Sequence, residues 1–223
     1  MSAERATALR PGSEAVVCVH GLWLSGFATG FWRSRFAQAG YAAHAFSYPT
    51  VRQTLKASAR QLADFACALP QERVHFAGHS LGAVLIAAML DEREWCLQGK
   101  KLGRIVLVGP PFQGTDVGRS IARIGFGRMV LGRAIAEWLD SPRPVVPDWI
   151  DLGVIAGSRP IGAGRIASPF LAQPHDGTVR VAETRVDGAR EHLTLPVSHT
   201  EMLMSARVAQ QMLRFFEHGA FTR

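Results

Sequence analysis

The sequence predicts an α/β fold of three layers, in which helices cover both faces of a mostly parallel sheet. Short apolar runs, such as residues 15–20 (AVVCVH) and 104–108 (RIVLV), are bounded by turn residues, as is typical of strands buried on both faces. Stretches with apolar residues at helical spacing alternate with these runs. A Gly-x-Ser-x-Gly pattern, residues 78–82, joins one predicted strand to one predicted helix. This alternation favours parallel strands with helices on both sides.

Length and composition are those of one globular domain that spans residues 1–223. Of the 223 residues, 48% are apolar and 19% are charged, which is enough for a sizeable core. The chain has no run of 18 apolar residues. Its N-terminus lacks the basic region followed by an apolar region that is typical of a secretory signal peptide. Cys18, Cys67 and Cys96 are scattered and lack metal-ligand spacing. We expect a reduced, cytoplasmic protein, with a mature secreted form as the alternative.

Strands and helices alternate through the first half of the chain. The strands are expected at residues 15–20, 41–48, 74–77 and 104–108, and the helices at residues 31–39, at 50–69 and from Leu81 onward. Gly40 is typical of the end of the first helix, and Pro70 closes the second.

Residues 112–149 interrupt this alternation. Apolar side chains interleaved with arginines and glycines predict two short amphipathic helices above the carboxyl edge of the sheet. The segment is either a small cap that covers the serine, binds lipid or docks on a membrane, or an excursion that packs its apolar face on the core. A strand at 149–156, a loop at 157–174, a strand at 191–197 and a helix at 201–218 complete the chain.

Ser80 is the candidate nucleophile. It is the centre of the Gly-x-Ser-x-Gly pattern, and a serine in a sharp strand-to-helix turn needs neighbours without side chains, here Gly78 and Gly82. The turn lifts the hydroxyl out of the backbone and places it at a helix N-terminus, where N–H groups favour negative charge. The pattern alone also fits an ordinary strand-to-helix turn.

His199 is the best candidate, among eight histidines, for the base that would activate Ser80. It lies between the last predicted strand and the final predicted helix, so it can reach over the carboxyl edge of the sheet. His79 precedes Ser80, and we expect its side chain to point away from that of the serine. His192 belongs to a predicted strand, and structural or surface positions are expected for His44, His75 and His218.

Asp176 is the leading candidate for an acid that orients the imidazole. It follows a Gly- and Pro-rich loop and begins an Asp-Gly pair, a pattern that also marks ordinary β-turns. The order Ser80, Asp176, His199 is that of a serine–acid–histidine triad. The alternative acids are Asp116 at the foot of the 112–149 segment, Asp151 inside a predicted strand, and Asp187 in a later turn.

A His20-Gly21-Leu22-Trp23 stretch follows the first predicted strand at the edge where ligands bind in open parallel sheets. The backbone N–H groups of Leu22 and Leu81 would together form an oxyanion hole. His20 either lines the site or holds this loop. The walls of an acyl pocket are assigned to Trp23, Phe112 and the 112–149 segment.

These stretches resemble those of small lipase-like α/β-hydrolases, the broad group of bacterial lipases, esterases and GPI inositol-deacylase-like proteins. The matching segments are VVCVHGLW, FSYPT, VHFAGHSLGA, VLVGPPFQGTD, HDGTVRV and VSHTEML. The resemblance implies an α/β-hydrolase fold with Ser80 as nucleophile, Asp176 as acid and His199 as base. A missing secretion signal and a small cap depart from secreted lipases with large lids.

A serine hydrolase that cleaves carboxylic esters through an acyl-enzyme, without metal or organic cofactor, is the activity we expect. Thioester hydrolysis or acyl transfer on the same triad is one alternative. A non-catalytic module that binds lipid or a partner protein is another. A fold by itself does not decide between them.

The net charge of +7 and the pI near 10.1 raise the question of a polyanionic partner. The arginines are spread along the chain, and no nucleic-acid motif accompanies them, so we expect no nucleic acid as partner. The expected partner is a small-molecule or lipid ester, with peripheral contact to an anionic membrane left open.

Overall fold

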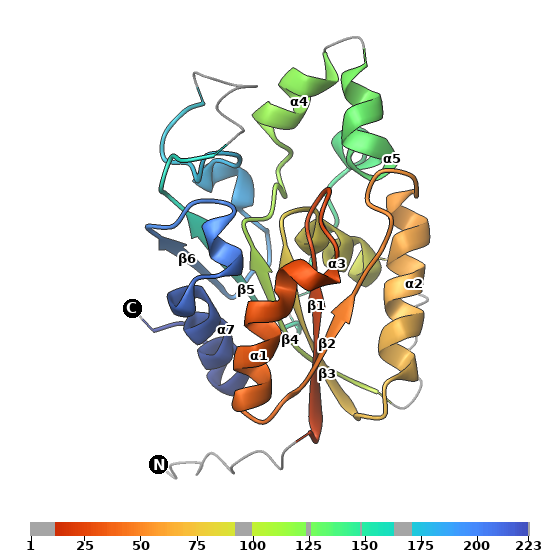
Figure 1. The fold of residues 1–223 in the computed structure, drawn as a ribbon, viewed down its shortest axis with the longest axis vertical. Helices are drawn as coiled ribbons and strands as arrows, with labels where there is room; N and C mark the ends of the chain where they lie inside the picture. Colours follow the sequence, from red (N-terminus) through yellow and green to blue (C-terminus); the bar gives the residue numbers. More distant parts are fainter. Residues whose placement is uncertain (1–11, 92–99, 124–125, 148, 163–170, 223) are drawn as a thin grey trace.

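The computed structural model describes residues 12–91, 100–123, 126–147, 149–162 and 171–222. Its strands form one six-stranded sheet in the order β2-β1-β3-β4-β5-β6, and all neighbouring pairs are parallel (Figure 1). Helices cover both faces. The predicted three-layer α/β fold is therefore confirmed.

Each of the six predicted strands is present. They are β1 (Glu14–Val19), β2 (Ala42–Phe46), β3 (Arg73–His79), β4 (Lys101–Val108), β5 (Leu152–Gly157) and β6 (Glu191–Leu195). β4 begins three residues before its prediction, because Lys101 and Leu102 pair with Arg73 and Val74 of β3, and backbone pairing does not require apolar side chains. Asp151, predicted inside a strand, lies just before β5.

The α-helices are α1 (Gly30–Gln38), α2 (Leu55–Ala68), α3 (Leu81–Asp91), α4 (Asp116–Ala122), α5 (Gly127–Asp140) and α7 (Ala206–His218). Two helices are shorter than predicted because hydroxyl side chains cap them. The Thr54 side chain accepts from the Ala57 N–H, so α2 begins at Leu55 and not at residue 50. Ser205 caps α7 in the same way, which leaves residues 201–203 as a separate 3₁₀ turn, η3 (Glu201–Leu203).

Two apolar clusters separate the layers. Side chains of α2 and α3 pack on one face of the sheet, and those of α1 and α7 pack on the other. Successive residues of β1 alternate between them: Val17 joins the first cluster and Cys18 the second. Burial on both faces explains why the central strands read as continuous apolar runs.

Residues 112–149, here called the cap segment, contain α4 and α5 where two helices were predicted, and both lie at one end of the molecule (Figure 1). α5 is kinked at Gly132, whose φ of 79° is not helical. Ile135 and Trp138 of α5 are buried in the same cluster as α2 and α3, so one face of the segment packs on the core. Phe126 and Met129 remain exposed. None of the helices in the described ranges has both the length and the apolar character that a membrane crossing requires.

Gly82 marks the close approach of α3 to β1. A Cβ at this position would lie 2.4 Å from the Val19 carbonyl oxygen, a rigid backbone atom. We expect Gly82→Ala to lower the free energy of unfolding by about 2–3 kcal/mol through this overpacking. Urea denaturation followed by circular dichroism measures the change.

Gly30→Ala is the matched control for that substitution. Gly30 begins α1 with a helical φ of −57°, and an added Cβ would meet only an Arg33 side-chain nitrogen at 3.9 Å. This substitution should be neutral or stabilise the fold by about 0.5–1 kcal/mol. Equal effects at the two positions would contradict the packing assigned to Gly82.

Candidate active site

Ser80 connects β3 to α3 through a turn with a positive φ of 54°. In the described part of the chain, the only other non-glycine residue with positive φ is Trp23. Such a backbone stores strain and is found mainly at functional sites. The Ser80 N–H donates to the Val108 carbonyl oxygen at 2.9 Å, and the residue remains partly exposed. The strained strand-to-helix turn expected from the glycine pattern is present.

Asp176 and His199 are joined by a buried hydrogen bond. The His199 Nδ1 and the Asp176 Oδ2 are 2.7 Å apart, and Asp176 has no exposed surface. The other carboxylate oxygen accepts from the N–H groups of Thr178 and Val179 at 2.9 and 2.7 Å. Burial acts to raise the pKa of Asp176, but attraction to His199 and these hydrogen bonds outweigh it and hold the pKa below its usual value. A proton on Nδ1 leaves the Nε2 lone pair of His199 available as a base.

The other candidate acids lie elsewhere. Asp116 forms ion pairs with Arg119 and Arg180, Asp151 pairs with Arg104 and Arg190, and Asp187 is exposed. Of the four carboxylates considered, Asp176 is the one hydrogen-bonded to His199. The described ranges also contain no group of three or more His, Cys, Asp or Glu side chains placed to hold a metal ion.

Ser80 and His199 each contact the backbone at the end of β4. Ser80 is bonded to Val108, and a Cβ on the next residue, Gly109, would lie 3.2 Å from two ring atoms of His199. Among the described residues, no hydrogen bond joins the Ser80 hydroxyl to the His199 ring. The two residues are brought near one another by their separate contacts with Val108 and Gly109. Contacts of this type often tighten only when substrate is bound.

The loop that follows β1 packs directly on the strand-to-helix turn at Ser80. A Cβ on Gly21 would lie 3.2 Å from the Ser80 Cβ and 3.0 Å from the His79 Nδ1, so a larger residue would crowd both side chains. Within the described chain, neither the Leu22 N–H nor the Leu81 N–H donates a hydrogen bond. Two unpaired backbone donors beside Ser80 are what an oxyanion hole requires.

His20 holds this loop from inside the protein. Its side chain is fully buried, its Nδ1 donates to the Gly21 carbonyl oxygen at 3.0 Å, and its Nε2 accepts from the Tyr48 N–H at 3.4 Å. The rings of His20 and Tyr48 stack at 4.7 Å. With both nitrogens engaged and the side chain buried, the contacts of His20 are those expected of the loop-holding alternative.

The two aromatic residues assigned to an acyl pocket differ in exposure. Trp23 is 60% exposed, and its indole N–H donates to the Val130 carbonyl oxygen of α5 at 3.1 Å. Phe112 is buried edge-to-face against Trp138, with ring centroids 5.5 Å apart. Trp23 therefore joins the loop that follows β1 to α5, whereas Phe112 packs against Trp138 on the buried side of α5.

The sequence matches the Alpha/beta hydrolase family over residues 16–221. This chain belongs to the alpha/beta hydrolase family. The match covers the strand-to-helix turn at Ser80, the turn at residues 175–180, here called the acid turn, and the loop that carries His199. The resemblance to lipase-like α/β-hydrolases is thereby confirmed at the level of the family. A search of curated protein sequences finds no significant match.

Solved structures share the alpha/beta hydrolase fold with this chain. The mature Bacillus licheniformis lipase BlEst2 is 15% identical with a TM-score of 0.67, and the alignment covers 99% of this chain and 96% of the lipase. A monoacylglycerol lipase of Paleococcus ferrophilus is 13% identical, with a TM-score of 0.61 and coverage of 95% and 96%. The NocB thioesterase domain from the Nocardicin cluster is 14% identical, with a TM-score of 0.59 and coverage of 92% and 94%.

His79 has a structural contact that sequence reasoning missed. The Nε2 of this buried ring donates to the His199 carbonyl oxygen at 2.9 Å, and the two rings lie 4.7 Å apart. Burial, together with the proximity of His199, lowers the pKa of His79 to about 3, so the ring is neutral. His79 therefore fastens the loop that presents His199.

Two histidines, the buried His79 and the partly buried His192, should make the fold sensitive to acid. Burial lowers the pKa of His79 to about 3 and that of His192 to about 4, whereas an unfolded histidine titrates near about 6.5. Between these values the unfolded state binds more protons, so the free energy of unfolding falls as the pH drops from about 6.5 towards 4. Urea denaturation at several pH values measures this slope.

His79→Gln removes one of these titrating groups while keeping a side-chain N–H donor. The slope of unfolding free energy against pH should therefore be shallower than in the unsubstituted protein over the same range. Identical slopes for the two proteins would contradict the neutral state assigned to His79.

Proposed function

We propose that this alpha/beta hydrolase cleaves carboxylic esters with Ser80 as nucleophile, His199 as base and Asp176 as acid. The observation that carries the proposal is the buried Asp176–His199 hydrogen bond beside a serine in a strained strand-to-helix turn. Membership of the alpha/beta hydrolase family and the fold shared with two lipases support an ester as substrate. No metal or organic cofactor enters the proposed reaction.

The reaction would run in two halves. The Ser80 oxygen attacks the ester carbonyl while the His199 Nε2 takes the hydroxyl proton, and Asp176 stabilises the resulting imidazolium. The N–H groups of Leu22 and Leu81 bind the oxyanion. The carbon–oxygen bond to the alcohol then breaks, and the alcohol leaves with the proton from His199. Water, deprotonated by the same nitrogen, cleaves the acyl-enzyme and restores Ser80.

Thioester hydrolysis is the second candidate. It uses the same nucleophile and base, and the fold shared with the NocB thioesterase domain supports it. Acyl transfer differs only in the molecule that accepts the acyl group. Product analysis with a competing alcohol separates transfer from hydrolysis.

The cap segment and Trp23 would form the wall of the acyl site. The indole is fixed between the loop that follows β1 and α5 by its bond to Val130, and Phe112 packs behind the same helix. A wall of this kind favours long acyl chains through apolar contact. Faster turnover of long-chain than of short-chain esters would support this assignment.

Exposed apolar side chains on the cap segment also favour peripheral contact with an anionic membrane. Phe126 and Met129 are 63% and 74% exposed, and the exposed Trp23 is bonded to Val130, the residue after Met129. The exposed Arg123 and Arg133 flank these residues in sequence, and the chain carries a net charge of +7. A cytoplasmic location is also proposed, because the three scattered cysteines do not suggest a disulfide framework.

The membrane proposal predicts salt-sensitive binding to vesicles that contain an anionic phospholipid. Met129→Ser should weaken co-sedimentation at low salt, because it removes an exposed apolar contact without touching the core. Vesicles of neutral phospholipid provide the control. Equal binding to the two vesicle types, or none at low salt, would contradict the proposal.

Hydrolysis of a p-nitrophenyl ester series of rising chain length tests the proposed activity. Ser80→Ala should lower kcat by about a thousandfold or more, because no other group attacks the carbonyl. Asp176→Asn should lower kcat by about 10⁴-fold, because the amide stabilises the wrong tautomer of His199.

Asp187→Asn is the matched control, since it makes the same carboxylate-to-amide change at an exposed position. Its kcat should remain within about twofold of the unsubstituted value. Undiminished turnover by Ser80→Ala would exclude the proposed mechanism.

A further inference from the structure

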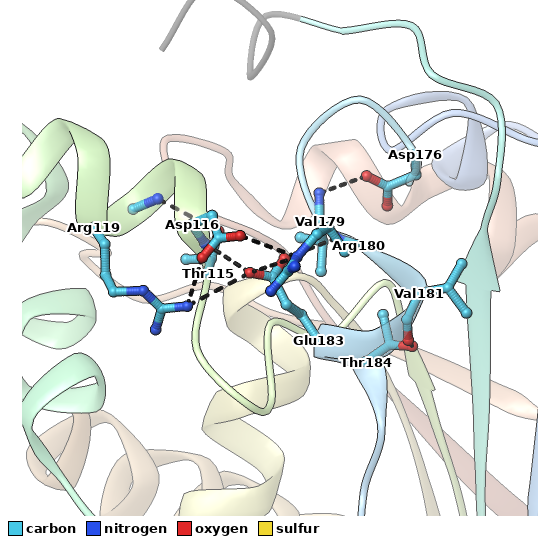
Figure 2. Close-up of polar contacts among 10 residues, drawn as sticks. Thr115, Asp116, Arg119, Asp176, Val179, Arg180, Val181, Glu183 and Thr184 are labelled. Atoms are coloured by element: carbon cyan, nitrogen blue, oxygen red, sulfur yellow. Dashed lines mark hydrogen bonds and ion pairs between the residues drawn. The ribbon is translucent and has the colours of Figure 1, made fainter. Parts of the chain in front are cut away.

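A second buried carboxylate lies beside the acid turn. Glu183, in the 3₁₀ turn η2 (Val181–Thr184), is 2% exposed. Its Oε1 accepts from the Asp116 N–H at 2.7 Å, and its Oε2 accepts from the Arg180 N–H at 2.8 Å. Asp116 begins α4, whereas Arg180 ends the acid turn. Figure 2 shows Glu183 between these two segments, so one carboxylate joins the cap segment to the acid turn.

The acid turn carries this connection to Asp176. The Val179 N–H donates to the Asp176 Oδ1 at 2.7 Å, and the next N–H along the chain, that of Arg180, donates to Glu183. Two buried carboxylates therefore hold two consecutive peptide groups. The Arg180 N–H and the Val179 carbonyl share one rigid peptide plane, and that carbonyl accepts from the Asp176 N–H at 3.0 Å, so a displacement of the Arg180 N–H also shifts the residue that carries the Asp176 carboxylate. The second oxygen of that carboxylate is bonded to His199.

Further contacts fix Glu183 against the cap segment. Its own carbonyl oxygen accepts from the Gln113 N–H at 2.9 Å. Arg180 lies 3.1 Å from the Asp116 carboxylate and 3.5 Å from Glu183, and Arg119 lies 2.8 Å from Asp116 and 3.8 Å from Glu183. Two arginines and two carboxylates thus connect α4 to the acid turn and to η2, which follows it, as the dashed contacts in Figure 2 trace.

Stability alone is a weak reason for this arrangement. Burial raises the pKa of Glu183, and the N–H donors and Arg180 only partly offset that effect. Replacing buried ion pairs with apolar groups is often neutral or stabilising, and the better-attested use of such pairs is to fix one geometry. The geometry fixed here is the position of the acid turn relative to α4.

We propose that Glu183 is a positioning residue for the triad: its carboxylate holds α4 and the acid turn in register, so that Asp176 keeps its bond to His199. This inference rests on the proposed ester hydrolysis. It predicts that a shift of the cap segment relative to the acid turn also changes the orientation of the His199 imidazole. Glu183 acts through the acid turn and does not touch the substrate.

Glu183→Gln tests the proposal, because it keeps the side-chain volume but supplies one acceptor where two N–H groups need one each. For p-nitrophenyl acetate, a substrate too small to require the cap segment, kcat should fall about tenfold with KM within twofold, as expected for a displaced catalytic group. In ¹⁵N-histidine-labelled protein, the proton resonance of the His199 Nδ1–H should shift or disappear. Loss of stability alone would not move that resonance in folded protein.

Asp151→Asn is the matched control. It makes the same carboxylate-to-amide change in another pair of arginine contacts, those with Arg104 and Arg190, at the amino end of β5. Both kcat and the His199 resonance should stay unchanged in this variant. A folded Glu183→Gln protein with unchanged kcat and resonance, or equal losses in Asp151→Asn, would overturn the proposal.

A second comparison serves if Glu183→Gln does not fold. Asp116→Pro removes the N–H that donates to Glu183. Proline is tolerated here, because Asp116 is at the first position of a helix and the extended ψ of 128° at Thr115 suits a following proline. Asp116→Ala keeps that N–H and removes only the side chain. The proline variant should have a kcat about threefold or more below that of the alanine variant. Equal kcat values would overturn the proposal.

The resonance comparison also separates the two proposals. If the unsubstituted protein does not hydrolyse esters, the proposed function fails. A shifted His199 resonance in Glu183→Gln would still support the coupling, and an unchanged one would refute it.

Discussion

The buried hydrogen bond between Asp176 and His199 is the contact on which the carboxyl edge of the sheet depends. A carboxylate without exposed surface is costly unless its oxygens are paired, and here they accept from the ring of His199 and from the N–H groups of Thr178 and Val179. The His199 N–H also donates to the Asp176 carbonyl oxygen at 2.9 Å. The acid turn and the loop that carries His199 therefore stabilise one another. Without the other segment, each would leave hydrogen-bonding groups of Asp176 or His199 without these partners.

Sheet order explains how residues far apart in the chain reach this contact. β3, β4, β5 and β6 are consecutive neighbours, so their carboxyl ends lie along one edge. Ser80 follows β3, Gly109 follows β4, the acid turn comes after β5, and His199 comes after β6. Small residues allow the layers to approach there, as at Gly21 against the Ser80 side chain. The fold thus delivers a hydroxyl, an imidazole and a carboxylate from separate connections to one neighbourhood.

Features with a local sequence signal could be predicted, and features made by long-range contact could not. The turn at Ser80 was predictable because two glycines flank the serine between a strand and a helix, and Asp176 because it begins an Asp-Gly pair. His79 and Glu183 carry no such signal, since their partners His199 and Asp116 lie 120 and 67 residues away. Strand and helix ends moved by a few residues where backbone pairing or hydroxyl caps, invisible to apolar periodicity, set the boundary.

The central claim is that the Ser80 hydroxyl, the two free N–H groups and the paired imidazole act on one reacting atom. A crystal structure of the protein after reaction with a fluorophosphonate ester tests it most directly. The account predicts a phosphorus atom bonded to the Ser80 oxygen, one phosphoryl oxygen within hydrogen-bond distance of the Leu22 and Leu81 N–H groups, and the His199 Nε2 facing the adduct. An unmodified Ser80, or an adduct whose phosphoryl oxygen points away from both N–H groups, would contradict it.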